Sequence, residues 1–222
     1  MPRRIIGLTQ KIEYLASRSK LFYWLSSHYY RNVIQNEINL ANITSDDHIL
    51  CIGGGICPFS AILFHQITGA EVTVIDNCEE CIREARQLIS RLGLGGQVHA
   101  IWQEGGNIEF SLSDFSVVHF ALQVFPMEGV LSSVRKQVIP GTKLLVRRPK
   151  ECLGKMYSQL TGSFPACCRH IIHRKTCNIG STVLYIKQER LNEGKKTTPS
   201  NLRPLDLRTA DTSIAFSCPV AV

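Results

Sequence analysis

The sequence predicts an α/β fold, with a mostly parallel sheet, an antiparallel hairpin at one edge, and helices ahead of the first strand. Short apolar runs rich in branched residues alternate with stretches of helical periodicity from residue 44 to residue 188. The last two apolar runs lie close together in the chain, as the strands of a hairpin do. We therefore expect a helical segment (residues 1–43), an α/β domain (44–188) and a flexible tail (189–222) rich in Lys, Thr, Pro and Asn.

Two helices are expected before the first strand, over residues 9–26 and 31–41, because apolar side chains recur at helical spacing in both. The stripe of the second helix consists of Tyr30, Ile34, Glu37, Ile38 and Ala41. Glu37 therefore shares or borders an apolar face, which is unusual for a carboxylate. Periodicity alone is equally consistent with a functional carboxylate and with a boundary glutamate in water.

A βαβ unit follows, with strands at 48–52 and 71–75 and a helix at 60–68. Gly53-Gly54-Gly55 lies at the first turn, where residues without a Cβ let the backbone approach a ligand closely. Asp76 ends the second strand, where a carboxylate can accept both hydroxyls of a ribose. This context predicts a nucleoside cradle that includes Gly53, Gly55, Asp76 and Asn77. The alternative is a glycine turn that only permits tight packing, with Asp76 as a helix cap.

The cradle departs from the dinucleotide fingerprint, because Cys57-Pro58-Phe59 stands where a third glycine is expected. Pro58 suits the start of a helix, but it has no N–H with which to hold a phosphate. The pattern therefore favours a ligand with a ribose and no phosphate, such as S-adenosylmethionine. Pro58 and Ser60 are candidate cofactor-binding residues at the start of this helix.

The remaining elements continue the alternation of helices and strands. We expect helices at 78–92, 127–138 and 153–160, and strands at 97–102, 114–124, 142–146, 170–175 and 182–187, the last two joined through residues 178–180. Glu104 follows the third strand, where an acid could meet an adenine edge. Phe120 and Ala121 lie near the tip of the fourth strand, beside the cradle, and are further candidates for the cofactor site.

Composition narrows the classes of function. The 222 residues carry a net charge of +7, with 44% hydrophobic and 19% charged residues. The basic residues are scattered without interleaved aromatic residues, so we expect no nucleic-acid partner. No apolar run could span a bilayer and the apolar start is too short for a signal peptide, so we expect a cytoplasmic protein without a membrane partner. Arg147-Arg148 and Lys150 form the densest basic patch, which fits a solvated face or an acidic small substrate.

Nine cysteines raise the question of a metal site or disulfides. Cys78 and Cys81 form a CxxC pair, but no second pair stands at zinc-ligand spacing. We expect reduced, mostly structural thiols and no metal site.

The chain resembles the class I S-adenosylmethionine-dependent methyltransferases, a Rossmann-like fold, over residues 30–187, and within them the nicotianamine synthase-like group of aminobutanoyl transferases. The similarity lies in the run 52–60 with its proline, in Pro140-Gly141-Thr142 leading to Arg147 and then Tyr157, and in 29–32 with Glu37. Two departures are Gly54 at the centre of the cradle and a shorter helical region before it than plant members have.

The resemblance implies S-adenosylmethionine as co-substrate and transfer of its 3-amino-3-carboxypropyl (aminobutanoyl) group to an amine of a small, amino-acid-like acceptor, as in biosynthesis of nicotianamine- or opine-type metallophores. By similarity, Tyr30 and Glu37 are the catalytic candidates that orient and deprotonate the acceptor, and Arg147 could hold a substrate carboxylate. A pathway partner resembling an opine dehydrogenase would fit. The alternatives are a small-molecule methyltransferase and a non-catalytic S-adenosylmethionine-binding protein.

Overall fold

The computed structural model describes residues 20–158, 160 and 168–189. All of these residues belong to one compact unit. The predicted tail lies outside the described residues, apart from its first residue, and so does most of the predicted helix at 9–26. Within the described residues, no helix is both long and apolar enough to cross a membrane.

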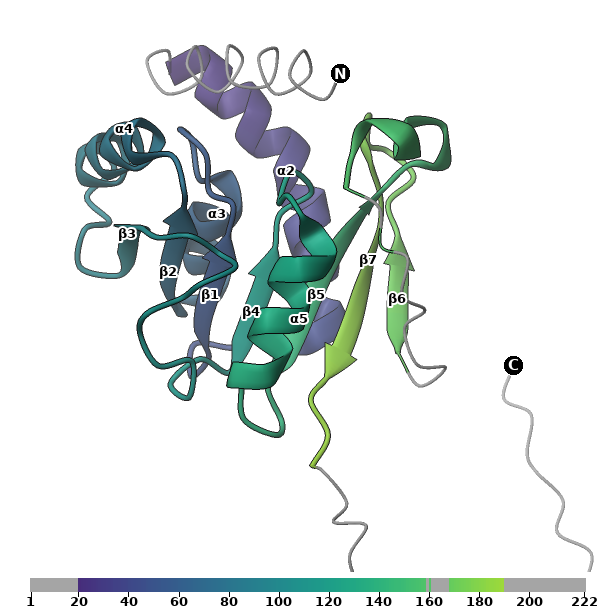
Figure 1. Ribbon diagram of the computed structural model, residues 1–222. Coiled ribbons are helices and arrows are strands. Elements are labelled where there is room, and N and C mark those ends of the chain that lie inside the picture. The colour runs from purple at the N-terminus through teal and green to yellow at the C-terminus, as the bar shows by residue number, and fades with distance from the viewer. Residues whose placement is uncertain (1–19, 159, 161–167, 190–222) are drawn as a thin grey trace, which may run out of the picture. The chain divides into compact units, whose positions relative to one another are not determined.

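A seven-stranded sheet in the order β3-β2-β1-β4-β5-β7-β6 forms the centre of this unit (Figure 1). The strands are β1 (His48–Ile52), β2 (Glu71–Asp76), β3 (Val98–Trp102), β4 (Val117–Phe120), β5 (Lys143–Pro149), β6 (Arg169–Ile172) and β7 (Ile179–Ile186). The first five strands are parallel, and β7 runs antiparallel to both β5 and β6. The predicted sheet and its antiparallel edge are confirmed.

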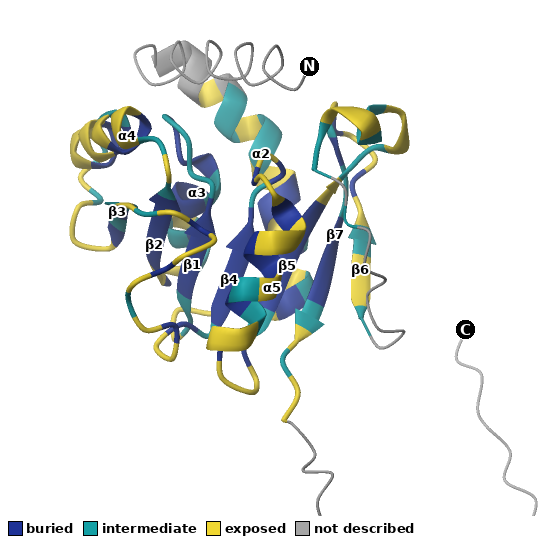
Figure 2. Cartoon of the chain, in the orientation of Figure 1, coloured by how far each residue is buried: buried dark blue, intermediate teal, exposed yellow. Residues whose placement is uncertain are grey.

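Helices cover both faces of the sheet. They are α2 (Lys20–Ala41), α3 (Phe59–Thr68), α4 (Glu79–Arg91) and α5 (Met127–Gln137), and a 3-10 helix, η1 (Glu151–Met156), follows β5. Alternate residues of each central strand point to opposite faces. Ile49 and Cys51 of β1 pack in the core beneath α2, α3 and α4, whereas Leu50 and Ile52 pack beneath α5. The central strands are therefore buried on both faces (Figure 2).

The largest errors in the predicted boundaries are at α2, β4, the turn after β5 and the hairpin, where β6 ends at Ile172 and β7 already begins at Ile179. α2 is one continuous helix through Tyr29 and Tyr30, because no Gly or Pro interrupts it there. β4 has only four residues of the predicted run 114–124, since the apolar residues on either side belong to loops that pack on the core. The turn after β5 is the 3-10 helix Glu151–Met156 rather than a helix at 153–160.

Candidate active site

The candidate site lies at the carboxyl ends of β1 and β4, where the order of the sheet reverses direction. Open α/β sheets bind ligands at this position, because the two neighbouring connections leave the sheet on opposite faces. The glycine turn at residues 53–55 leaves β1 here and leads into α3. Gly53 has φ +85°, and a Cβ on Gly54 would lie 2.3 Å from Cγ2 of Val74, so both positions require glycine.

Asp76 ties this turn to the end of β2. Its Oδ2 accepts a hydrogen bond from the N–H of Gly55 at 2.8 Å, and its Oδ1 accepts one from the N–H of Cys78 at 2.9 Å. Cys78 itself is the N-cap of α4, with its Sγ accepting from the N–H of Cys81. Asp76 therefore does not cap the helix, and each of its oxygens retains a lone pair for a ligand.

A cavity of about 280 Å³, here called the donor cavity, opens beside Asp76. Its walls include five of the predicted cofactor-binding residues, Gly53, Gly55, Asp76, Asn77 and Glu104. Asn77 Nδ2 donates to Glu104 Oε2 at 3.4 Å, which joins the tips of β2 and β3. The sequence motif and the cavity therefore coincide at this end of the site.

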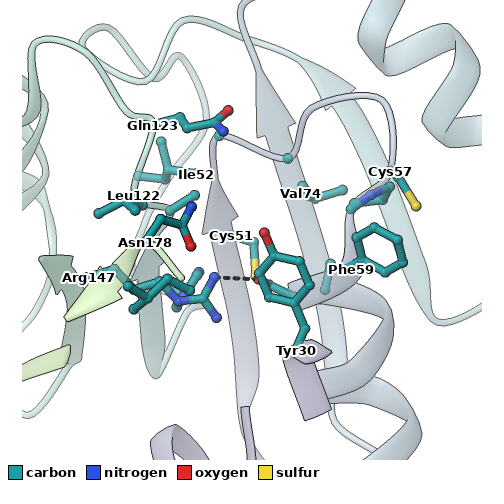
Figure 3. Close-up of a pocket in the computed structure, with 18 residues that line it drawn as sticks. Tyr30, Cys51, Ile52, Cys57, Phe59, Val74, Leu122, Gln123, Arg147 and Asn178 are labelled. Atoms are coloured by element: carbon teal, nitrogen blue, oxygen red, sulfur yellow. Dashed lines mark hydrogen bonds between the residues drawn. The ribbon is translucent and has the colours of Figure 1, made fainter. Parts of the chain in front are cut away.

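A smaller cavity of about 50 Å³, here called the central cavity, lies on the other side of the glycine turn (Figure 3). It shares Ile52, Gly53 and Gln123 with the donor cavity. Its walls include the predicted residues Tyr30, Pro58, Ser60, Ala121 and Arg147. Figure 3 shows that Arg147, Asn178 and Tyr30 come from separate elements and point into the same space.

Phe120 is the predicted cofactor-binding residue that lines neither cavity. Its side chain is fully buried in the core beneath α5. Strand alternation explains the placement, because His119 points to the face with α2 and Phe120 to the opposite one. The side chain of Phe120 is therefore a core residue.

Glu37 and Arg147 form a fully buried ion pair between α2 and β5. Arg147 donates from Nε to Oε1 and from Nη2 to Oε2 of Glu37, both at 2.8 Å. Its Nη1 donates to Ser60 Oγ at 2.9 Å, a hydrogen bond drawn in Figure 3. Three of the five N–H groups of Arg147 are thus engaged by described residues, and two remain for a ligand.

Two residues that the sequence analysis did not select complete this cluster. Thr182 on β7 donates its hydroxyl to Glu37 Oε1 at 2.7 Å, and Nε2 of the buried His119 lies 3.6 Å from Glu37 Oε2. Thr182 is directly paired with Arg147 across the sheet. Thr182 and His119 both belong to strands whose apolar pattern predicts burial. A polar residue inside such a run is expected to have a buried polar partner, and this signal could have identified both residues from the sequence.

The cluster sets the protonation of its members. Burial by itself would raise the pKa of Glu37, but the Arg147 guanidinium outweighs it and holds that pKa well below its usual range. Burial, together with the charge of Arg147, lowers the pKa of His119, so this imidazole is neutral at pH 7. The site therefore contains a buried carboxylate and guanidinium beside a neutral histidine.

Tyr30 lies between the ion pair and the glycine turn. Its ring stacks on Phe59 with centroids 5.4 Å apart, and Cζ of Arg147 lies 5.8 Å from the ring centroid. The neighbouring Tyr29 donates its hydroxyl to Asn178 Oδ1 at 3.0 Å and accepts from the N–H of Cys177. These contacts fix α2 against the start of β7 and place Tyr30 at the wall of the central cavity.

Comparison with known sequences finds relatives for about half of the chain, although no protein-family model matches it. An L-histidine 2-aminobutanoyltransferase of Yersinia pestis is 31% identical over 116 residues, covering 51% of this chain and 42% of that protein. One of the same name from Pseudomonas aeruginosa (strain UCBPP-PA14) is 27% identical over 116 residues, 51% of this chain and 43% of that protein. The chain spans less than half the length of these curated relatives.

Solved structures are similar over more of the chain. MtNAS matches as a point mutant in complex with S-adenosylmethionine, with a TM-score of 0.69 and 20% identity, covering 84% of this chain and 76% of that one. MtNAS in complex with MTA and tNA has a TM-score of 0.67 and 19% identity, over 84% and 73% of the two chains. An RNA methyltransferase from Salinibacter ruber in complex with S-adenosyl-L-homocysteine has a TM-score of 0.54 and 16% identity, over 73% and 94%.

The predicted fold class is confirmed: the chain has the class I S-adenosylmethionine-dependent methyltransferase fold. Its resemblance to the nicotianamine synthase-like group is also confirmed, through the aminobutanoyltransferase sequences and the MtNAS structures.

Proposed function

We propose that this chain is an S-adenosylmethionine-dependent transferase that moves the aminobutanoyl group to an amine of a small, amino-acid-like acceptor, in synthesis of a nicotianamine- or opine-type metallophore. The observation that carries the proposal is that Tyr30 and Arg147 line the central cavity, which shares walls with the donor cavity, and that the buried Glu37 pairs with Arg147 directly behind that wall. The resemblance assigns roles to these three residues, and two elements far apart in the chain supply them. A cytoplasmic location and an opine-dehydrogenase-like partner belong to the same proposal.

The donor cavity fits a nucleoside without a phosphate. The free lone pairs of Asp76 suit the two ribose hydroxyls, and Asn77 and Glu104 at the neighbouring strand tips suit an adenine edge. Gly53 and Gly54 let the turn pack closely against Val124 and Val74, which sets the backbone of the turn into the wall between the two cavities. The donor's tail would then pass the glycine turn toward the central cavity, because the two cavities share walls.

Bound in this way, S-adenosylmethionine supplies an activated carbon together with its own leaving group. The lone pair of the acceptor nitrogen forms the new N–C bond, the electrons of the broken C–S bond pass to sulfur, and the nitrogen releases a proton. The protein's contribution is to position the amine and to accept that proton. Arg147 can hold a substrate carboxylate with its two remaining N–H groups while it keeps its bonds to Glu37.

Glu37 is the proposed base, and its pairing with Arg147 also fixes the guanidinium that receives the substrate. The low pKa of the paired carboxylate makes it a weak proton acceptor before the substrate binds. A substrate carboxylate on Arg147 would place a second negative charge near Glu37 and raise its pKa. Acceptor binding would therefore move Glu37 toward the range in which it takes a proton.

The by-product tests this proposal, because it reports which carbon was attacked. The full chain is incubated with S-adenosylmethionine and a panel of amino acids that includes L-histidine, and the nucleoside products are separated by chromatography. We expect methylthioadenosine that appears only when an acceptor is present. S-adenosylhomocysteine would instead establish methyl transfer, and donor binding without either product across the panel would reject an enzyme for these acceptors.

The role of Glu37 is tested separately by Glu37→Gln, which keeps the shape of the side chain. Because glutamine cannot neutralise the buried Arg147, circular dichroism first establishes that the variant is folded under the assay conditions. The folded variant should keep its donor affinity within about twofold of the wild type, because Glu37 does not line the donor cavity. We expect turnover to fall by at least about 100-fold, the usual contribution of a general base. Unchanged turnover would reject the assignment of Glu37 as the base and leave its contacts with Arg147 as a structural role.

A further inference from the structure

A third cavity, here called the basic cleft, adjoins the candidate site at the carboxyl ends of β5 and β6. Its volume is about 830 Å³, within the range typical of small-molecule sites. It shares Leu122 and Arg147 with the central cavity. The donor cavity, the central cavity and the basic cleft therefore form a series, and a molecule in the basic cleft can face the donor's tail across Arg147.

Cations dominate the polar side chains that line the basic cleft. Arg148, Lys150 and Arg174 contribute three positive charges, His170 and His173 add imidazoles, and Glu151 is the one carboxylate among the described residues of the wall. None of the three cations forms an ion pair with any described residue. This contrasts with Arg147, whose charge Glu37 neutralises.

The backbone brings these cations together. Gly180 lets the start of β7 approach residues 149–150, because a Cβ there would lie 2.7 Å from the carbonyl oxygen of Pro149. The N–H of Lys150 donates to the carbonyl oxygen of Asn178 at 3.0 Å. Arg148 extends from the end of β5, paired with Ser181, and Arg174 follows β6. The positive charges are therefore held around one space by the ends of three adjacent strands.

We propose that the basic cleft binds the acceptor, and that this acceptor is an amino acid carrying a second carboxylate. This inference rests on the proposed function, which requires an amine beside the central cavity. Arg147 can take the first carboxylate with its two remaining N–H groups, so a neutral side chain would leave Arg148, Lys150 and Arg174 without a counter-charge. A side-chain carboxylate satisfies them, and charge-assisted hydrogen bonds from Arg are the strongest available to it.

Matched acceptors provide the first test. Methylthioadenosine formation is measured with L-glutamate against L-glutamine and L-aspartate against L-asparagine, with L-histidine alongside, since each pair differs in one charge. We expect kcat/KM to be at least about tenfold higher for the acid of each pair, the size of one charge-assisted hydrogen bond. Equal rates within both pairs, or turnover of L-histidine alone, would overturn the cleft assignment and leave aminobutanoyl transfer intact.

Variants of the cleft provide the second test. Arg148→Gln and Arg174→Gln should each raise KM for the dicarboxylic acceptor about tenfold. KM for the amide acceptor and Kd for S-adenosylmethionine should stay unchanged. Lys155→Gln is the matched control, because Lys155 is exposed on η1 and does not line the cleft. Equal effects on the acid and the amide, or an effect of the control as large as that of the variants, would overturn the proposal.

A binding measurement separates this proposal from the proposed function. L-Glutamate is titrated into the full chain saturated with methylthioadenosine, and the heat of binding is recorded. Binding that Arg148→Gln and Arg174→Gln weaken would support the cleft even if no turnover occurred, in which case only the transfer reaction would fail. Absence of glutamate binding would reject the cleft as a dicarboxylate site, whatever the turnover.

Discussion

The donor cavity and the Glu37–Arg147 cluster lie on two sides of one glycine turn, but they are built differently. At the donor cavity, Asp76 accepts from the backbone N–H groups of Gly55 and Cys78, and these three partly exposed residues all lie within residues 55–78. The cluster is made of side chains from α2, β4, β5 and β7, and it is fully buried. Glu37 and Thr182, which share a hydrogen bond, are 145 positions apart in the chain.

Because of this difference, substitutions in one region should affect ligand binding and substitutions in the other should affect the stability of the fold. A partly exposed carboxylate with backbone donors can be replaced without leaving a buried charge, so its loss should mainly affect the ligand. If a buried ion pair loses one partner, the other is left as a charge without a counter-charge and without water to solvate it. We therefore expect substitutions in the cluster to destabilise the fold and substitutions in the donor cavity to weaken donor binding.

Arg147→Met should have the largest effect on stability. It leaves the carboxylate of Glu37 without its counter-charge, which costs about 3–5 kcal/mol in comparable buried pairs. Urea unfolding followed by circular dichroism measures the change. The double variant Glu37→Leu with Arg147→Met is the matched control and should recover much of the loss, because it removes both charges. A single variant within about 1 kcal/mol of the wild type would contradict the coupling.

Asp76→Ala should have the largest effect on the donor cavity. Loss of the ribose acceptor should weaken S-adenosylmethionine binding by about 1.5–3 kcal/mol, or roughly ten- to 150-fold in Kd. Calorimetric titration measures this, and Glu79→Ala, an exposed position outside the cavity, is the control. The comparison breaks down if Asp76→Ala destabilises the fold as much as Arg147→Met while donor affinity is retained.

Lowering the pH should reduce the stability of the fold by a smaller amount, through the buried histidines. Burial lowers the pKa of His119 and of His173 below 6.5, so only the unfolded chain binds these protons as the pH falls below about 6.5. Stability should decline there by up to about 1.4 kcal/mol per pH unit for each histidine. Glu37, whose folded pKa is depressed, adds a further loss only as the pH falls below its unfolded value of 4.5.

His119→Phe measures the share of this decline that belongs to the cluster. Phenylalanine can keep the edge-on contact that the His119 ring makes with Phe64, but it has no proton to bind. The free energy of unfolding is determined by urea titration between pH 7.5 and 5. We expect a shallower slope in the variant, and an identical slope would assign the acid loss to groups outside the cluster.

The amount that could be predicted from the sequence follows the same division. The strand runs, the glycine turn, Pro58 and Asp76 are local patterns, and the structure places the turn and Asp76 at one cavity. The position of Glu37 on an apolar face was also visible, whereas its partner was not. Periodicity identifies the face of a residue but not the element that packs against that face. For the same reason, Phe120 was expected near the cofactor but belongs to the opposite face of the sheet.

The sequence by itself determined the fold class and the glycine turn and Asp76 that line one cavity, because these depend on short-range backbone chemistry. The binding of a nucleoside without a phosphate at that turn stays a prediction. Only the tertiary structure decided that Glu37 pairs with Arg147, that Thr182 and His119 complete the cluster, and that Arg148, Lys150 and Arg174 surround one cleft. Those arrangements depend on the order of strands in the sheet, which brings β5 and β7 together and sets α2 against them. Strand order follows from packing over the whole domain and not from any local pattern.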